Sequence, residues 1–191
     1  MIEPDPVRVV LDACVLIPAA LRDTLLRMAI AGLYQPYWSE DILAEVQRNL
    51  VAHQMTIPAR ALHLVATVRR AFPQAMVDGY AHRMDDLETH PDDRHVLAAA
   101  IVADAGVIVT ANLRHFPATA LAPHGVMAQD PDTFLTELVV RAPLTSTRVI
   151  LEQAADLRNP PATPNDVLDR LAGHAPRFVQ EVRTILDQIA R

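Results

Sequence analysis

The chain has 191 residues, of which 51% are hydrophobic and 21% are charged, and its formal net charge is −6. This length and composition predict one domain of ordinary size with a small appendage, and they exclude a disordered chain. No stretch reaches the ~18 uncharged apolar residues that a membrane helix needs, and the N-terminus lacks the basic start of a signal peptide. We therefore expect a cytoplasmic protein that does not insert into membranes.

Charge and cysteine content narrow the possible functions. A net acidic chain does not coat nucleic acid by bulk attraction, because that mode needs basic side chains to neutralise phosphates, but a nuclease is not excluded. All 17 basic residues are arginine, so any phosphate contacts would be planar and bidentate. The simpler explanation for the use of arginine without lysine is a GC-rich coding sequence. The single cysteine, Cys14, excludes an internal disulfide and forms no metal cage by itself.

The first third of the chain begins with a buried strand. Residues 7–11, VRVVL, form a continuous apolar run, which is typical of a strand buried on both faces, and Asp12 follows it at once. Pro18 begins a helix that continues to Gly32. After the short segment YQPYW, residues 34–38, to which no strand or helix is assigned, Ser39 is expected to cap the next helix.

The middle of the chain continues the alternation of helices and strands. A helix is expected to begin at residues 56–58, and residues 73–90 are expected to form a loop with an acidic stretch. An alanine-rich helix begins at Pro91 and ends at Gly106. VIVT, residues 107–110, predicts a second buried strand, and GVMAQ, residues 125–129, a third. This order predicts an α/β fold: a mainly parallel sheet flanked by helices.

Beyond Asp130 only helical patterns remain. They cover residues 131–141, 147–158, 165–173 and 177–190, with prolines breaking them. We predict an α/β domain over residues 1–142 and a small all-helical C-terminal extension over residues 143–191.

Three acidic residues from distant parts of the chain are predicted to converge. Asp12 ends the first strand, Asp93 opens the helix that leads to the second, and Glu45 lies one turn into its helix beside the apolar stripe. Functional groups of an open parallel sheet gather at the carboxyl ends of its strands and the amino ends of the following helices. We therefore expect these three carboxylates over one edge of the sheet.

A cluster of bare carboxylates is unfavourable, because like charges repel one another and raise the carboxylate pKa values. A hard divalent cation, Mg²⁺ or Mn²⁺, would relieve this repulsion, bind phosphate oxygens and activate water. Each acid also has a purely structural interpretation: Asp12 as the cap of a turn, Asp93 as a helix N-cap and Glu45 as a surface residue. Asp92 is better interpreted as a cap than as a ligand.

Three stretches carry a resemblance to a known family. VVLDACVLIP, SEDILAEVQRNL and DDRHVLAAAIVADAGVIVTANLRHFP, in that order and at these intervals, resemble a PIN domain, particularly the VapC-like toxins of bacterial toxin–antitoxin modules. The resemblance covers roughly residues 7–130. The helical tail also resembles the extension of one VapC-like subgroup.

The resemblance implies a Rossmann-like fold and a Mg²⁺- or Mn²⁺-dependent endoribonuclease. It assigns metal-binding and catalytic roles to Asp12, Glu45 and Asp93, and it places Asn112 where relatives carry Asn or Asp close to the metal. It further implies an RNA substrate, an antitoxin protein as partner and a homodimer.

The sequence departs from the family pattern at two positions. His115 stands near the place where many relatives carry another acid, which leaves a fourth carboxylate and a second metal open. His115 is either an acid or base or, as we favour, a structural residue. Cys14 replaces a polar residue and is expected to weaken the hydrogen bonding there. The pair His90 and His95 suggests zinc only if a third ligand lies nearby.

Other hypotheses remain open. Arg94 and Arg114 flank the predicted site and are either RNA contacts or ordinary surface charges. The same acids would also suit a non-catalytic binding module that receives an arginine from a partner, or a metal-dependent DNA nuclease. A phosphatase or NTPase is disfavoured, since the chain has neither Asp-x-Asp after the first strand nor a glycine-rich phosphate loop.

Overall fold

The structure is a computed structural model that describes residues 6–189 and divides into two compact units. The first contains residues 6–17 and 35–129, and the second contains residues 18–34 and 130–189. The N-terminal residues that bear on a signal peptide, and residue 190 of the last predicted helix, lie outside the described part. In the part described, no helix has the length and apolar character needed to cross a bilayer.

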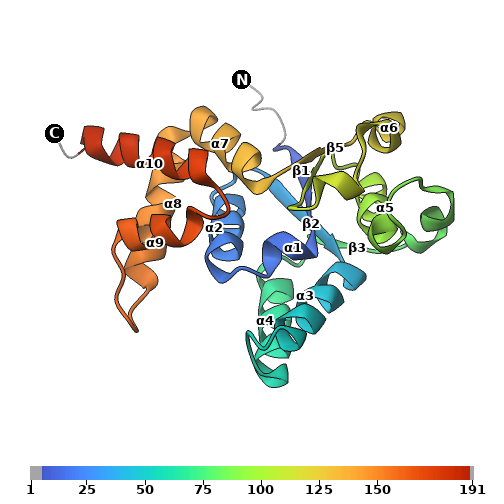
Figure 1. Cartoon of the computed structure of the whole chain (residues 1–191), viewed down its shortest axis with the longest axis horizontal. Coiled ribbons are helices and arrows are strands. Elements are labelled where there is room, and N and C mark those ends of the chain that lie inside the picture. The colour runs from blue at the N-terminus through green and yellow to red at the C-terminus, as the bar shows by residue number, and fades with distance from the viewer. Residues whose placement is uncertain (1–5, 190–191) are drawn as a thin grey trace. The chain divides into compact units, whose positions relative to one another are not determined.

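The first unit is built on a five-stranded parallel sheet (Figure 1). Its strands are β1 (Arg8–Leu11), β2 (Gln35–Ser39), β3 (Met76–Val77), β4 (Val107–Val109) and β5 (Met127–Gln129), in the spatial order β3-β2-β1-β4-β5. The predicted α/β fold with a parallel sheet is confirmed, and the predicted strands correspond to β1, β4 and β5.

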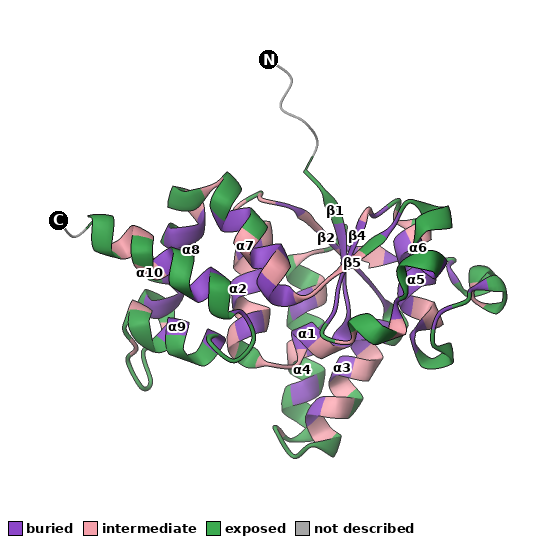
Figure 2. Ribbon diagram, turned by 45° about the horizontal axis from the view of Figure 1, so that its top comes forward, coloured by how far each residue is buried: buried purple, intermediate pink, exposed green. Residues whose placement is uncertain are grey.

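Helices and short 3₁₀ turns surround this sheet. They are α1 (Ala13–Leu16), α3 (Glu40–Ala52), α4 (Pro58–Ala71), η1 (Ala81–Asp86), η2 (Pro91–Asp93), α5 (Arg94–Val102), η3 (Leu113–His115), α6 (Ala118–Leu121) and η4 (Ala122–His124). Helix α5 packs on β1, β2 and β4. Its alanines 98–100 are fully buried. Their small side chains let the helix lie close to the strands. Figure 2 shows part of α5 in the purple of buried residues.

Residues 35–39 form strand β2, which the sequence analysis did not predict. Pro36 is the misleading residue, because proline cannot donate to a sheet ladder and is confined to edges and strand starts. Here β3 pairs only with Trp38 and Ser39, and β1 pairs with Pro36 on the other side. The β3 side of β2 is therefore unpaired at Pro36, and the missing N–H is tolerated.

Several element boundaries also differ from the predictions. Helix α5 ends at Val102 and not at Gly106, because Asp104 adopts the left-handed conformation with φ 51°. The predicted loop 73–90 contains β3 and η1. Ser39 is confirmed as a cap: its side chain accepts a hydrogen bond from the backbone N–H of Ile42.

The strand order places a topological switch point between β1 and β4. The chain moves outward from β1 through β2 to β3, and then returns to the other side of β1 to form β4 and β5. In open parallel sheets, ligands bind outside the carboxyl ends of the strands at such a point. Asp12 directly follows β1, and Thr110 directly follows β4.

The second unit is entirely helical. It contains α2 (Ala19–Ile30), α7 (Pro131–Arg141), α8 (Pro143–Asp156), α9 (Pro164–Leu171) and α10 (Pro176–Ile189). Tyr34 packs edge-to-face on Phe134, with ring centroids 5.0 Å apart, and the buried Thr24 hydroxyl donates to Gln153 Oε1 at 2.8 Å. Residues 18–34 therefore pack with the C-terminal helices. The division into domains 1–142 and 143–191 stays a prediction.

Candidate active site

Asp12 is a buried carboxylate at the switch point. It is 2% exposed, and its backbone N–H donates to the carbonyl oxygen of Val109 at 3.1 Å, which ties it to the end of β4. Burial raises the pKa of its carboxyl, hydrogen bonds from Thr110 and Cys14 lower it, and the charges of Glu45 and Asp93 raise it further; the net shift is upward. The interpretation of Asp12 as a turn cap has no support, since its side chain makes no cap hydrogen bond.

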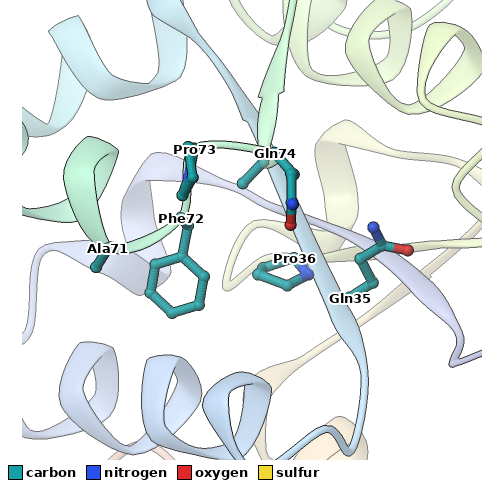
Figure 3. A pocket seen from close by; sticks show the side chains of 7 residues that line it. Gln35, Pro36, Ala71, Phe72, Pro73 and Gln74 are labelled. Atoms are coloured by element: carbon teal, nitrogen blue, oxygen red, sulfur yellow. The ribbon is translucent and has the colours of Figure 1, made fainter.

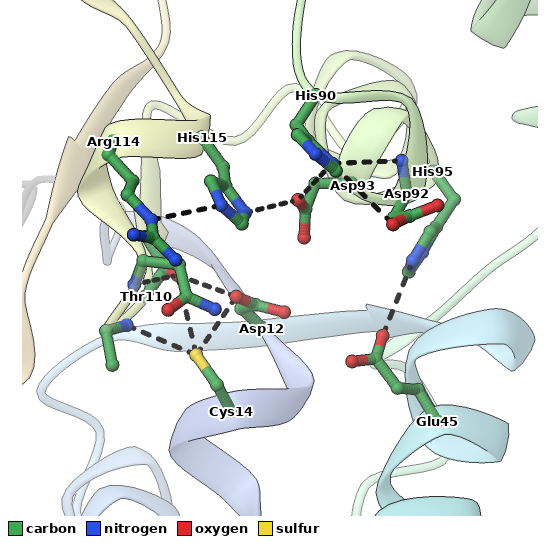
Figure 4. A network of polar contacts seen from close by, with 12 residues as sticks. Asp12, Cys14, Glu45, His90, Asp92, Asp93, His95, Thr110, Arg114 and His115 are labelled. Carbon is green, nitrogen blue, oxygen red and sulfur yellow. Dashed lines mark hydrogen bonds and ion pairs between the residues drawn. The ribbon is translucent and has the colours of Figure 1, made fainter.

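Two donors hold one oxygen of this carboxylate. The Thr110 hydroxyl donates to Asp12 Oδ2 at 2.6 Å, and the Cys14 thiol donates to the same atom at 3.0 Å. The other oxygen of Asp12 points toward the space between Asp93 and Glu45 (Figure 4). The donors therefore leave one carboxylate oxygen turned toward the other acids.

Cys14 still supplies a hydrogen bond at its position, with a thiol in place of a more polar group. Burial, followed by the nearby charge of Asp12, raises the pKa of the thiol to about 12. The thiol stays protonated and can donate, and its sulfur accepts from the backbone N–H of Ala111 at 3.2 Å. The predicted weakening is consistent with sulfur being the poorer donor.

Asp93 lies where η2 passes into α5, and it is 9% exposed. Asp93 occupies the N-cap position of α5, as its structural interpretation expects, but its side chain makes no hydrogen bond to the helix backbone. Asp93 Oδ2 instead lies 2.8 Å from His115 Nδ1 and 3.5 Å from His90 Nδ1. The two imidazole rings stack, with centroids 4.4 Å apart and an angle of 15° between their planes.

The tautomer of His115 follows from its two neighbours. Arg114 Nε donates to His115 Nε2 at 3.2 Å. Since the guanidinium can only donate, Nε2 accepts and the ring proton lies on Nδ1, which donates to Asp93. His115 therefore donates a hydrogen bond to Asp93 at 2.8 Å, and its structural role stays a prediction.

Glu45 projects from α3 beside the same site and is paired with His95. Glu45 Oε2 lies 3.6 Å from His95 Nε2, and Asn49 donates to Oε1 at 3.4 Å. Burial lowers the pKa of His95, but its hydrogen bond with Glu45 and the charges of Glu45, Asp41 and Asp12 raise it more, so the net shift is upward. His95 therefore does not join His90 in a zinc site.

Of the remaining predicted residues, Asn112 and Arg114 contact residues of the site. Asn112 is half-buried, and its backbone N–H donates to Thr110 Oγ1 at 3.0 Å. Arg114 is exposed, and Arg94 is half-buried with its Nε unpaired.

Sequence reasoning missed Thr110 and the contact of His115 with Asp93. The only available signal was a hydroxyl residue at the end of the buried run VIVT.

The predicted acids meet around one space but do not all touch. Figure 4 shows Asp12, Asp93 and Glu45 on three sides of it. Among the described residues, the ligand atoms of these three do not all lie within 4.8 Å of one another. A carboxylate-rich donor set still suits a hard cation that takes one or two carboxylates directly and others through water. Asp12 and Asp93 could hold such an ion, with Glu45 acting through water.

A separate pocket has no charged lining. It has a volume of about 90 Å³ and lies at the amino end of β2, away from the end of the sheet that carries Asp12 (Figure 3). Its lining residues are Gln35, Pro36, Ala71, Phe72, Pro73, Gln74 and Ala75. Without an ionisable group, this pocket does not suit metal or phosphate chemistry.

Comparison with known proteins identifies the family of the chain. The family model for the PIN domain matches residues 8–114, and the model for the VapC50 C-terminal domain matches residues 131–184. A Mycobacterium tuberculosis (strain ATCC 25618 / H37Rv) protein with the name "Putative ribonuclease VapC50" is 36% identical over 124 residues, which cover 63% of this chain and 73% of that protein. No solved structure matches the chain. The chain belongs to the PIN domain family, and it is VapC-like with a C-terminal extension.

Proposed function

We propose that this protein is a Mg²⁺- or Mn²⁺-dependent endoribonuclease and the toxin of a type II toxin–antitoxin module. The PIN domain and the name of the related mycobacterial protein support a ribonuclease. The three acids around one space support the metal dependence.

The observation that carries the proposal is the buried Asp12 carboxylate with two further acids close to it. A buried charge needs a partner, and the nearby charges of Glu45 and Asp93 make an unpartnered Asp12 still less favourable. A divalent cation held by Asp12 and Asp93 relieves both effects. Asn112 is assigned a hydrogen bond to this centre from the rim.

The side chains around the acids fix their orientation. Thr110 and Cys14 hold Asp12 Oδ2, and His115 holds Asp93 Oδ2, so the second oxygen of each carboxylate is free to face the ion. Such supporting hydrogen bonds commonly tune metal affinity. When bound, the cation would bind phosphate oxygens and activate water for in-line attack on a phosphodiester.

Glu45 is assigned the task of orienting the attacking water. Its pairing with His95 fixes one carboxylate oxygen and the direction of the other. Arg94 and Arg114 are assigned contacts to RNA phosphates, since both lie beside the acids and arginine binds phosphate in a bidentate manner.

An RNA substrate, an antitoxin partner and a homodimer belong to this proposal and follow from the family resemblance. A cytoplasmic location is part of it, because the proposed substrate is cellular RNA.

The direct test incubates the purified full-length protein with a panel of transfer, ribosomal and single-stranded RNAs, with Mg²⁺ or with EDTA. We expect cleavage only with the ion, and a loss of at least about 100-fold in Asp12→Asn and Asp93→Asn, because even supporting residues of metal sites contribute 10–100-fold. The matched control is Asp92→Asn, which neutralises the exposed neighbour of Asp93. Equal cleavage by wild type and Asp12→Asn would contradict the assignment.

Calorimetric titration with Mg²⁺ separates the enzyme from a non-catalytic module with an arginine-binding acidic pocket. The enzyme requires saturable Mg²⁺ binding that Asp12→Asn abolishes. A wild-type chain that binds no Mg²⁺ would favour the binding module.

A further inference from the structure

We propose that His90, Asp93 and His115 form a second metal site, which takes a borderline transition-metal ion such as Zn²⁺ and shares Asp93 with the oxygen-rich site. The binding claim stands on this cluster alone. Its consequence for RNA cleavage rests on the proposed function.

The three ligand atoms are already close together. His90 Nδ1, Asp93 Oδ2 and His115 Nδ1 all lie within 4.8 Å of one another. Zn–N and Zn–O bonds of about 2.0–2.1 Å in a tetrahedron separate neighbouring ligand atoms by roughly 3.3 Å. Asp93 Oδ2 lies 2.8 Å from one nitrogen and 3.5 Å from the other. Because the two imidazole rings are stacked, one of them must turn out of the stack before both nitrogens can face the same ion.

The local backbone explains why these side chains converge. His90 and Asp93 are three residues apart on a 3₁₀ turn, and the Asp93 N–H donates to the His90 carbonyl oxygen at 2.9 Å. Side chains three residues apart on such a turn lie on the same side. The His90 backbone N–H donates to the His115 carbonyl oxygen at 3.4 Å, which joins the two segments.

The donor set selects the kind of ion. Two imidazole nitrogens and one carboxylate suit Zn²⁺, Co²⁺, Ni²⁺ or Fe²⁺, whereas Mg²⁺ prefers oxygen ligands. His90 is exposed, so an ion here would keep an open position for water. The Asp93 oxygen not facing the histidines points toward Asp12 in Figure 4, so one carboxylate can serve both sites.

Metal binding at Nδ1 also changes the hydrogen bonds of both histidines. His90 Nδ1 loses the hydrogen bond that it accepts from the Asp92 backbone N–H at 3.4 Å. The proton of His115 moves to Nε2, which can then no longer accept from Arg114 Nε. Arg114 is exposed and free to turn toward solvent.

The test is a calorimetric titration of the metal-free full-length chain with Zn²⁺ in a large excess of Mg²⁺, with Co²⁺ absorption as a second readout. We expect one equivalent of Zn²⁺ to bind. His90→Ala and His115→Ala should each weaken binding by at least about tenfold, since even the supporting residues of metal sites contribute 10–100-fold. The matched control is His124→Ala, which removes an exposed histidine of η4 and should bind like wild type.

Asp12→Asn separates this proposal from the proposed function. It should lose Mg²⁺ binding and RNA cleavage but keep Zn²⁺ binding. If Zn²⁺ binding is also lost in Asp12→Asn, or is unchanged in both histidine variants, the second site does not exist. Should a histidine variant fail to fold, the wild-type chain still decides, because a failure to bind Zn²⁺ in the absence of Mg²⁺ overturns the proposal.

In the wild-type chain, Zn²⁺ should lower Mg²⁺-dependent cleavage, because it draws on Asp93. Cleavage by His115→Ala should resist Zn²⁺ more than cleavage by wild type. Equal inhibition of both proteins would show that Zn²⁺ acts elsewhere.

Discussion

Replacing Thr110 by valine removes the hydroxyl that supports Asp12 and keeps nearly the same shape. Thr110 is fully buried, donates to Asp12 Oδ2 at 2.6 Å and accepts from the Asn112 N–H at 3.0 Å. A hydrogen bond to a charged group contributes about 1.5–3 kcal/mol, and the half-exposed Asn112 N–H can regain water, so we expect a loss of about 2–3 kcal/mol. Mg²⁺ affinity should fall by about 10–100-fold, as is typical when a supporting hydrogen bond is lost.

Urea unfolding in EDTA measures the first effect, and calorimetric Mg²⁺ titration measures the second. Thr110→Ser is the matched control, because it keeps the hydroxyl and loses one methyl group, at about 1 kcal/mol. Its Mg²⁺ affinity should stay close to that of wild type. If Thr110→Val binds Mg²⁺ as tightly as Thr110→Ser, the hydroxyl of Thr110 does not support metal binding by Asp12.

Three further predictions concern pH and the helical unit. The pKa of Asp12 is raised in the folded chain. Its protonated carboxyl therefore contributes stability below pH 3.8, the ordinary pKa, and this contribution is lost as the pH rises through the folded pKa. In EDTA, the unfolding free energy of wild type relative to Asp12→Asn should therefore fall with pH across that window; no such fall would contradict the burial argument. The pKa of His95 is also raised, so its charged imidazole contributes stability below pH 6.5, and this contribution is lost as the pH rises through the folded pKa. Unfolding of His95→Gln should lack this loss, and identical pH profiles would exclude the Glu45 pairing. In the second unit, Asp132 accepts from the Phe178 backbone N–H at 3.0 Å, so Asp132→Ala should lower the unfolding free energy by about 1–3 kcal/mol. Its Mg²⁺ affinity should be unchanged, and a parallel loss of Mg²⁺ binding would show that the effect reaches the acidic site.

The strands that sequence analysis predicted are those that consist mainly of consecutive apolar residues. Residues 9–11 and 107–109 are apolar throughout, and all six are buried in the sheet. The strand at residues 35–39 contains Pro36. The sheet tolerates this proline because β3, which comes from a distant segment, has only two residues and does not reach Pro36. Local patterns carry no information about such pairing.

The same distinction applies to the site. Asp12, Glu45 and Asp93 were predicted together because strand ends and helix starts of a parallel sheet share one edge. The partners of these acids were not predicted, because each lies on a different segment. Thr110, His95 and His115 carry no periodic signal, and only the folded chain brings them to their carboxylates.

The central claim is that Asp12 and Asp93 together bind a hard divalent ion. Mg²⁺-dependent stability tests it most directly, because Mg²⁺ does not favour the histidine cluster. At 100 times its dissociation constant, Mg²⁺ should stabilise the wild-type chain and Asp92→Asn by about 2.7 kcal/mol, and it should leave Asp12→Asn and Asp93→Asn unchanged. Equal stabilisation of all four proteins, or of none, would contradict the claim.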